Sequence, residues 1–95
     1  MTIIERYGTV LRLWDAPKYV DRYTIMPPRW ARDYREARGF LTLGCSAEPF
    51  HPQGVGQHST AIAGSHLGRR IRWADLPADV QRAARNSFPE YAPKE

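Results

Sequence analysis

The clearest periodic pattern in the sequence lies near its C-terminal end. Apolar residues recur there at the spacing that places side chains on one face of a helix; they are Leu76, Val80, Ala83, Ala84 and Phe88. Asp75 is a candidate N-cap, Pro77 suits a first turn because no partner is needed for its missing N–H, and Asp79 suits the positive helix end. The pattern predicts one amphipathic helix, which must bury its apolar face against another element.

The preceding sequence predicts strands for that helix to cover. Residues 9–14 alternate between two faces, residues 15–18 carry a turn signal, and residues 19–26 alternate again, so we expect a hairpin. Residues 40–43 are expected to form a third strand buried on both faces. Together with the helix, these segments predict an α+β fold: a small antiparallel sheet of three to four strands, a long structured loop, and one C-terminal helix packed on the sheet.

Length and composition limit the organisation of the chain. A sequence of 95 residues with 42% hydrophobic residues suits one globular domain. We expect this domain over residues 1–88 and a frayed tail over residues 89–95, where prolines prevent the helix from continuing. No stretch approaches the roughly 18 apolar residues of a membrane span, so we expect no membrane partner. The single cysteine, Cys45, cannot form an internal disulfide, which favours a reducing, cytoplasmic location.

The least generic passage is the loop expected over residues 46–68. It holds two prolines, four glycines and all three histidines, and it has little periodicity. Long loops in small domains are usually functional. Candidate partner-binding residues within it are His51, Gln53, Gln57 and His58; residues expected to shape it are Pro52, Gly54, Gly56 and His66. One small strand is expected near residues 60–63.

The histidines allow more than one interpretation. Three imidazoles at His51, His58 and His66 could hold a metal ion with an activated water, although their spacing matches no short metal motif. A histidine acting with Cys45 as nucleophile would need the two side chains adjacent in space. The alternative is structural, with imidazole and amide groups bonding the backbone of the loop. Because no catalytic set stands out, we expect no catalytic residue, no metal and no cofactor.

Basic residues define a second candidate surface. The chain carries 14 basic and 10 acidic residues, and the formal net charge is +4. Arg69, Arg70 and Arg72 follow one another closely in sequence, and such a field attracts nucleic acid or an acidic protein face. The aromatic residues could stack on bases, with core packing as the alternative role; they are Trp14, Tyr23, Trp30, Tyr34 and Trp73.

Several segments together resemble a group of short uncharacterised proteins encoded by bacteriophages and related mobile elements. The similar segments cover roughly positions 21 to 80; they are Asp21-Arg22-Tyr23-Thr24, Pro49-Phe50-His51-Pro52-Gln53-Gly54 with Gly56-Gln57-His58, His66-Leu67-Gly68-Arg69-Arg70-Ile71 and Asp75-Leu76-Pro77. The charged segment 29–38 departs from that group. The resemblance implies no activity, but it implies a context, because small phage accessory proteins often bind and block host complexes.

These observations lead to one principal expectation and two alternatives. We expect a non-enzymatic phage-type accessory protein in the host cytoplasm that binds a host protein or ribonucleoprotein complex, as an inhibitor of a defence system such as CRISPR. The first alternative is direct binding of nucleic acid or a nucleotide through the arginine-rich surface. The second alternative is a histidine-centred, metal-dependent hydrolase. The oligomeric state does not follow from the sequence.

Overall fold

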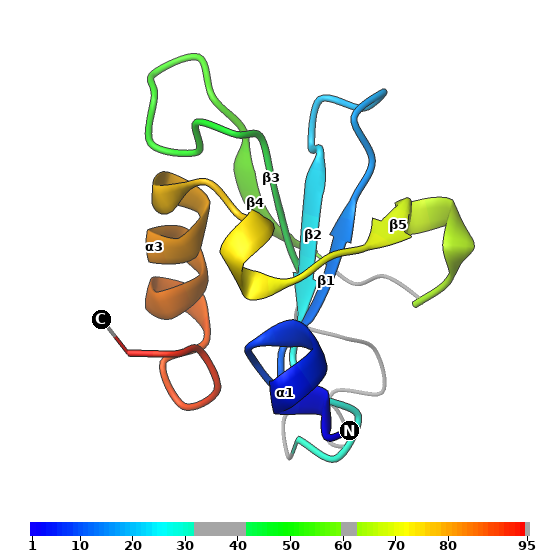
Figure 1. The fold of residues 1–95 in the computed structure, drawn as a ribbon. Helices are drawn as coiled ribbons and strands as arrows, with labels where there is room; N and C mark the ends of the chain where they lie inside the picture. Colours follow the sequence, from blue (N-terminus) through cyan, green and yellow to red (C-terminus); the bar gives the residue numbers. More distant parts are fainter. Residues whose placement is uncertain (32–41, 60–62, 95) are drawn as a thin grey trace.

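The computed structural model describes residues 1–31, 42–59 and 63–94, and its centre is an antiparallel sheet of five strands in the order β4-β3-β2-β1-β5 (Figure 1). The strands are β1 (Arg12–Asp15), β2 (Tyr23–Met26), β3 (Thr42–Cys45), β4 (Gly56–Ser59) and β5 (Arg69–Arg70). The predicted α+β class is confirmed, with one correction: the sheet has five strands rather than three or four. The additional edge strand, β5, is too short to show an alternating pattern.

Strands β1 and β2 form the predicted hairpin, but their connection is longer than expected. The sequence predicts a turn at residues 15–18, whereas β2 begins only at Tyr23. Two contacts close the wider connection. The Ala16 N–H donates to the Arg22 carbonyl at 2.8 Å, and Arg22 Nε lies 2.6 Å from Asp15 Oδ1. The Asp15 side chain is buried, and its ion pair with Arg22 joins the last residue of β1 to the residue that precedes β2.

Strands β3 and β4 differ from the predicted boundaries. The sequence predicts a strand at 40–43, but β3 runs to Cys45, and residues 40 and 41 lie outside the described part. Gly44 continues the strand because it pairs with Thr24 on one side and Gln57 on the other. Strand β4 lies inside the segment predicted as loop, and of the strand expected near 60–63 only residue 63 is described. Gly56 and Gln57 of β4 have a low intrinsic preference for strands, so β4 forms because it pairs with β3.

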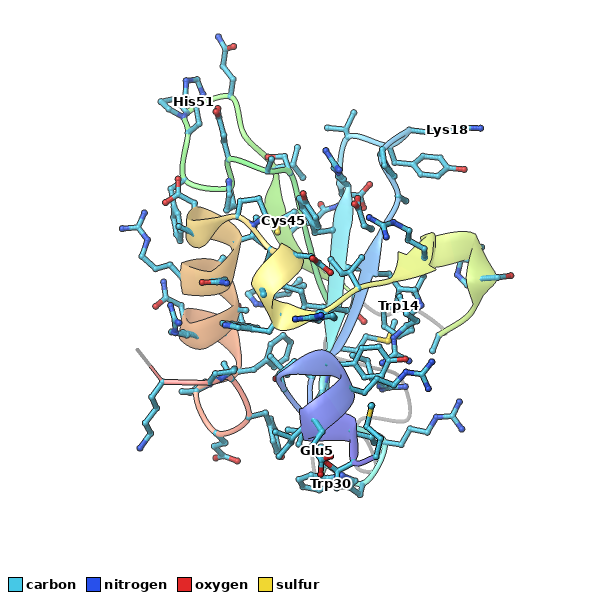
Figure 2. The ribbon with its side chains drawn as sticks, viewed as in Figure 1. Glu5, Trp14, Lys18, Trp30, Cys45 and His51 are labelled. Carbon is cyan, nitrogen blue, oxygen red and sulfur yellow. The ribbon has the colours of Figure 1, made fainter. Side chains whose placement is uncertain are left out.

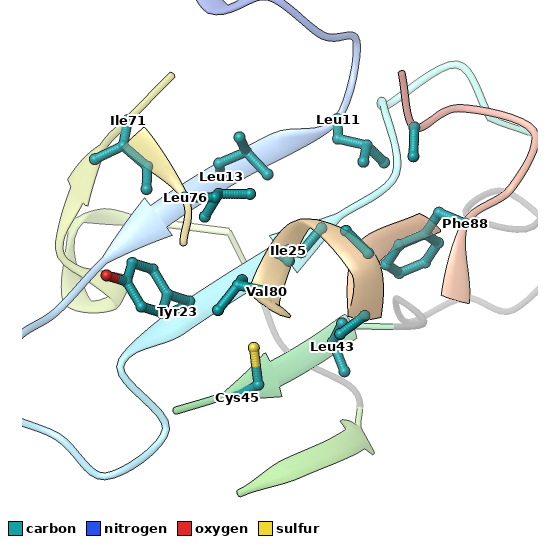
Figure 3. Packing of buried hydrophobic residues seen from close by; sticks show 13 residues of the cluster. Leu11, Leu13, Tyr23, Ile25, Leu43, Cys45, Ile71, Leu76, Val80 and Phe88 are labelled. Atoms are coloured by element: carbon teal, nitrogen blue, oxygen red, sulfur yellow. The ribbon is translucent and has the colours of Figure 1, made fainter. Parts of the chain in front are cut away.

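The C-terminal helix α3 (Ala78–Ser87) covers one face of the sheet, as predicted (Figures 1 and 3). Its start differs from the prediction. Asp75 belongs to the short 3-10 turn η2 (Trp73–Asp75), where its carboxylate accepts a bond from the Arg72 N–H at 3.0 Å, and Pro77 takes the N-cap position instead. The core between helix and sheet consists of Leu11, Leu13, Tyr23, Ile25, Leu43, Cys45, Ile71, Leu76, Val80, Ala83, Ala84, Phe88 and Ala92.

The segment after α3 corrects the prediction of a frayed tail, for its described residues 89–94. Pro89 follows the end of the helix, but the chain turns back because the N–H groups of Tyr91 and Ala92 both donate to the Phe88 carbonyl. Ala92 is thereby buried in the core, and the Arg85 guanidinium donates to the Pro93 carbonyl at 2.8 Å. These bonds and the burial of Ala92 hold the described tail against the core, although the prolines prevent the helix from continuing.

An N-terminal helix, α1 (Ile3–Tyr7), was not expected from the sequence and lies at the end of the sheet remote from the β3–β4 loop (Figure 1). The hydroxyl oxygen of Thr2 caps it by accepting the Glu5 N–H at 3.0 Å. Gly8 ends the helix in the left-handed conformation, with φ of 74°. The short element places Tyr7 where it can contact the β5 side of the sheet.

Candidate functional site

The two surfaces predicted from the sequence lie apart in the structure. The histidine-rich loop leads into β4, whereas the arginine run includes β5, and these strands form opposite edges of the sheet. With neighbouring strands about 4.8 Å apart, the two edges are separated by roughly 19 Å. Figure 2 shows His51 at the tip of the loop, at the far end of the molecule from Trp30. A single partner-binding face made from both sets of residues is therefore not formed.

The β3–β4 loop is closed by its own hydrogen bonds. The Ser46 N–H donates to the Val55 carbonyl at 2.8 Å, and the Val55 N–H donates to the Ser46 hydroxyl at 3.1 Å. Within the loop, His51 Nδ1 accepts the Gln53 N–H at 3.1 Å. Imidazole thus supports the loop backbone, as one interpretation of the sequence predicts. The side chains of Gln53 and Gln57 are exposed and make no hydrogen bond to another described residue.

Gly54 is the position on which the shape of this loop depends. A Cβ atom at Gly54 would lie 1.9 Å from the Glu48 carbonyl oxygen, and that oxygen also accepts the His51 N–H. We expect Gly54→Ala to open the loop and to destabilise the protein by about 1–3 kcal/mol, because backbone must shift to relieve the contact. Urea unfolding measures this cost, and Gly56→Ala is the matched control, since its Cβ would make an ordinary 3.5 Å contact with Pro49. Equal stability of the two variants would contradict the dependence of the loop shape on Gly54.

The three histidines serve different parts of the structure. His51 belongs to the loop, and His66 lies in the 3-10 turn η1 (Ser65–Leu67) and lines a pocket with Ala16 and Tyr19 of the β1–β2 connection. His58, on β4, reaches the other way to α3, where its Nε2 lies 2.9 Å from the Ser87 hydroxyl. Among the residues that the structure describes, no group of three His, Cys, Asp or Glu side chains could hold a metal ion.

The contact between His58 and Ser87 is the one place where a histidine meets a hydroxyl among the described bonds. A serine beside an imidazole is the minimal arrangement for nucleophilic catalysis. Ser87, however, is the last residue of α3, where the helix dipole is negative and disfavours the oxyanion of an acyl-transfer intermediate. The contact lies at the surface, where His58 is exposed and Ser87 is partly buried. The pair is therefore best explained as a contact that fixes the edge strand to the helix.

Cys45 and the histidines are not arranged as a catalytic pair. Cys45 is 0% exposed beneath α3 and belongs to the hydrophobic core (Figure 3). Burial, with a smaller contribution from the charge of Asp21, raises the pKa of its thiol to about 11. A reactive cysteine needs a lowered pKa and access to substrate. Its buried position at the end of β3 gives it a structural role in the core.

The arginine run is divided between the two faces of the sheet edge. Arg70 pairs with Trp14 and Arg69 pairs with Asp15, so their side chains leave β5 in opposite directions. Arg69 lines a pocket of about 450 Å³ together with Lys18. Arg72 is exposed beside η2. The sequence cluster therefore does not form one patch, and Arg70 belongs to a different site from Arg69.

On its own face, Arg70 joins residues from three other parts of the chain. A pocket of about 360 Å³ is lined by Ile3 and Tyr7 of α1, Val10 and Arg12 around the start of β1, Pro28, Arg29 and Trp30 after β2, and Arg70 of β5. We call this set the arginine–aromatic pocket. Three of these residues carry a permanent positive charge, and none of the described lining residues is acidic. The volume lies in the usual range of ligand-binding pockets.

The Arg70 guanidinium is positioned by aromatic rings. It lies 4.7 Å from the Tyr7 ring centre and 5.0 Å from the Trp14 ring centre. Such stacking covers the faces of a guanidinium and leaves its N–H groups at the edge, where they can bind two oxygens of a phosphate or carboxylate. Trp14 is 5% exposed, which shows that this ring has a packing role as well.

Arg12 and Trp30 complete the pocket in different ways. Arg12 is buried, and its Nε donates to the Pro27 carbonyl at 2.8 Å, so its charge is fixed at the base of β1. Trp30 is 57% exposed and meets Tyr91 edge to face, with ring centres 5.8 Å apart and planes at 78°. Figure 2 shows Trp30 at the same end of the molecule as α1, whereas Trp14 belongs to β1. The pocket thus combines fixed cations with one exposed indole.

Sequence reasoning identified Arg70 and Trp30 but not their neighbours Tyr7, Arg12 and Arg29. One signal was available, because Arg12 alternates onto the same face of its strand as Trp14. Of the other aromatic candidates, Tyr23 belongs to the core, and Trp73 is partly buried against the core. Tyr34 lies outside the described residues. The charged segment 29–38 is described only up to residue 31.

Two further findings bear on the class of the protein. None of the helices in the described part of the chain has the length and apolar character needed to cross a membrane. Comparisons with protein-family models, with curated proteins and with solved structures found no match.

Proposed function

We propose that this chain is a non-enzymatic binding protein that recognises an anionic macromolecule through the arginine–aromatic pocket. The observation that carries the proposal is that Arg29 and Arg70, from two separate segments, line one pocket whose described lining contains no acidic residue. Like charges repel, so their convergence costs free energy that a structural role alone does not require. An anionic partner would offset this cost on binding.

The position of Arg70 supports the same proposal. The rings of Tyr7 and Trp14 restrict its guanidinium before any partner arrives, which lowers the entropy lost on binding. The net charge of +4 adds a long-range attraction that raises the rate of encounter with a polyanion. The exposed edge of β5 leaves this side of the sheet accessible among the described residues.

Removal of the Arg70 charge tests the proposal. We expect the protein to bind heparin, used as a polyanion of no particular sequence, and Arg70→Gln to weaken this binding about tenfold, since charged hydrogen bonds are worth about 1.5–3 kcal/mol. Titration by calorimetry at several salt concentrations measures the change. Arg82→Gln is the matched control, because it removes the same charge from α3, where Arg82 stacks on Phe50 at 4.1 Å. Equal weakening by both variants would show that net charge alone drives binding.

The resemblance to bacteriophage proteins motivates a more specific candidate for the partner. It is the host protein or ribonucleoprotein complex expected from the sequence, with this chain acting as an inhibitor of a defence system such as CRISPR. Expression of the protein in cells that carry an active defence system, followed by plasmid or phage challenge, tests this candidate. Full retention of immunity in every system tried, with no host complex recovered on the purified protein, would remove it.

A further inference from the structure

We infer that the arginine–aromatic pocket binds single-stranded nucleic acid, with a base stacked on Trp30 and an adjoining phosphate held by Arg70 and Arg29. This inference rests on the proposed function and names the class of polyanion. It depends on the combination of an exposed aromatic ring with guanidinium groups in one pocket. Proteins that bind single strands combine these two elements, because bases offer flat faces and the backbone offers phosphates.

Trp30 is the ring available for stacking. Tyr7 is engaged by two cations, with Arg6 at 5.3 Å and Arg70 at 4.7 Å from its ring centre. Trp30 instead is more than half exposed and meets only the edge-to-face contact with Tyr91 among the described ring contacts. An exposed tryptophan is costly to keep in water, and burial against a base would recover part of that cost.

The phosphate would be held by cations at two positions of the same pocket. Arg70 presents its N–H edge from β5, and Arg29 adds an exposed charge next to Trp30 in sequence. A nucleotide places its base and phosphate a short distance apart, so a ring and a guanidinium that line one pocket of about 360 Å³ suit the two groups together.

Other polyanions fit the pocket less well. In a duplex the base faces are stacked on one another, so Trp30 would find no free face to contact. An acidic peptide presents carboxylates but needs no exposed indole. A single strand uses both parts of the pocket, and its bases are free to unstack.

Binding of fluorescein-labelled single strands of DNA and RNA, compared with a duplex of the same sequence and with heparin, tests the inference by fluorescence anisotropy over a range of salt. We expect the single strands to bind about tenfold more tightly than the duplex. Trp30→Ala should weaken single-strand binding by about tenfold, in the range measured for base stacking, and leave heparin binding unchanged. Trp30→Phe should retain most of the affinity. Tyr19→Ala is the matched control, since Tyr19 is 63% exposed on the β1–β2 connection.

Arg29→Gln serves as the charge variant here, because the exposed Arg29 can be replaced without disturbing the stacked Arg70. It should weaken binding to single strands and to heparin alike, and reduce the slope of log K against log salt by about one. Equal affinity for single strand and duplex, with no effect of Trp30→Ala, would overturn the inference while leaving the proposed function intact. If Arg82→Gln weakened binding as much as both pocket variants, Arg29→Gln and Arg70→Gln, then both the inference and the proposed function would be overturned.

Discussion

Gly68→Ala is expected to destabilise the protein by about 3 kcal/mol or more and to detach β5 from the sheet. Gly68 has φ of 103°, a conformation that residues with a Cβ atom rarely adopt, and a Cβ there would lie 2.1 Å from the Asp15 carbonyl oxygen. The strain of the backbone and the steric clash act together. Urea unfolding measures the loss of stability, and the loss of Arg70 from its ring contacts would accompany it.

The control for this experiment lies in the same segment. Gly64 has extended backbone, with φ of 173°, and a Cβ there would meet only the His66 side chain at 3.0 Å, which can move aside. We therefore expect Gly64→Ala to change stability by less than about 1 kcal/mol. If Gly68→Ala were as stable as Gly64→Ala, this result would contradict the close packing of Gly68 against the Asp15 carbonyl.

Cys45 is expected to react with iodoacetamide at least 100-fold more slowly in the folded than in the unfolded protein near pH 8. Its pKa, raised to about 11 from an ordinary value of 9.0, leaves roughly 100-fold less thiolate at that pH, and the side chain is also 0% exposed. Alkylation followed by mass spectrometry, with and without urea, measures the ratio. Rapid alkylation without urea would contradict the position of Cys45 beneath α3.

The same burial predicts a dependence of stability on pH. Because the folded pKa is higher than the unfolded value, only the unfolded chain releases the Cys45 proton as the pH rises from about 9 towards about 11. The contribution of the buried Cys45 thiol to the free energy of unfolding is therefore complete below pH 9 and is lost as the pH rises to about 11. Burial also raises the pKa of Tyr23, which acts in the same direction. In Cys45→Ala, urea unfolding should show a smaller loss of stability between about pH 9 and about 11. A loss of stability equal to that of the unsubstituted protein would contradict this explanation.

Signals that act over a few residues predicted much of the fold. The spacing of Leu76, Val80 and Phe88 identifies the buried face of α3, since helical periodicity depends only on neighbours along the chain. Alternation likewise identifies Leu13 and Ile25 as core residues of the hairpin. The N-terminal helix carried its own local signals, with Thr2 before Glu5 and Gly8 at the end, and could have been predicted from them.

Boundaries set by contacts across the sheet could not be predicted. Strand β4 exists because Gln57 and His58 pair with β3, although their own propensity favours loop. Strand β5 exists because Gly68 passes closely against the Asp15 carbonyl, and Ala92 is in the core because the chain turns back after Phe88. For β4 and β5 the determining partner is remote in sequence, so no pattern of adjacent residues contains the information.

The amino-acid sequence alone determined the α+β class, the buried face of the helix, the hairpin and the positive charge, because each follows from spacing or from composition. Only the tertiary structure decided which charges act together. The strand β5 sends Arg69 and Arg70 to opposite faces, and the end of the sheet brings Arg12, Arg29 and Trp30 to Arg70 from other segments. The physical reason is that the direction of a side chain follows from strand pairing, which neighbours in sequence do not specify.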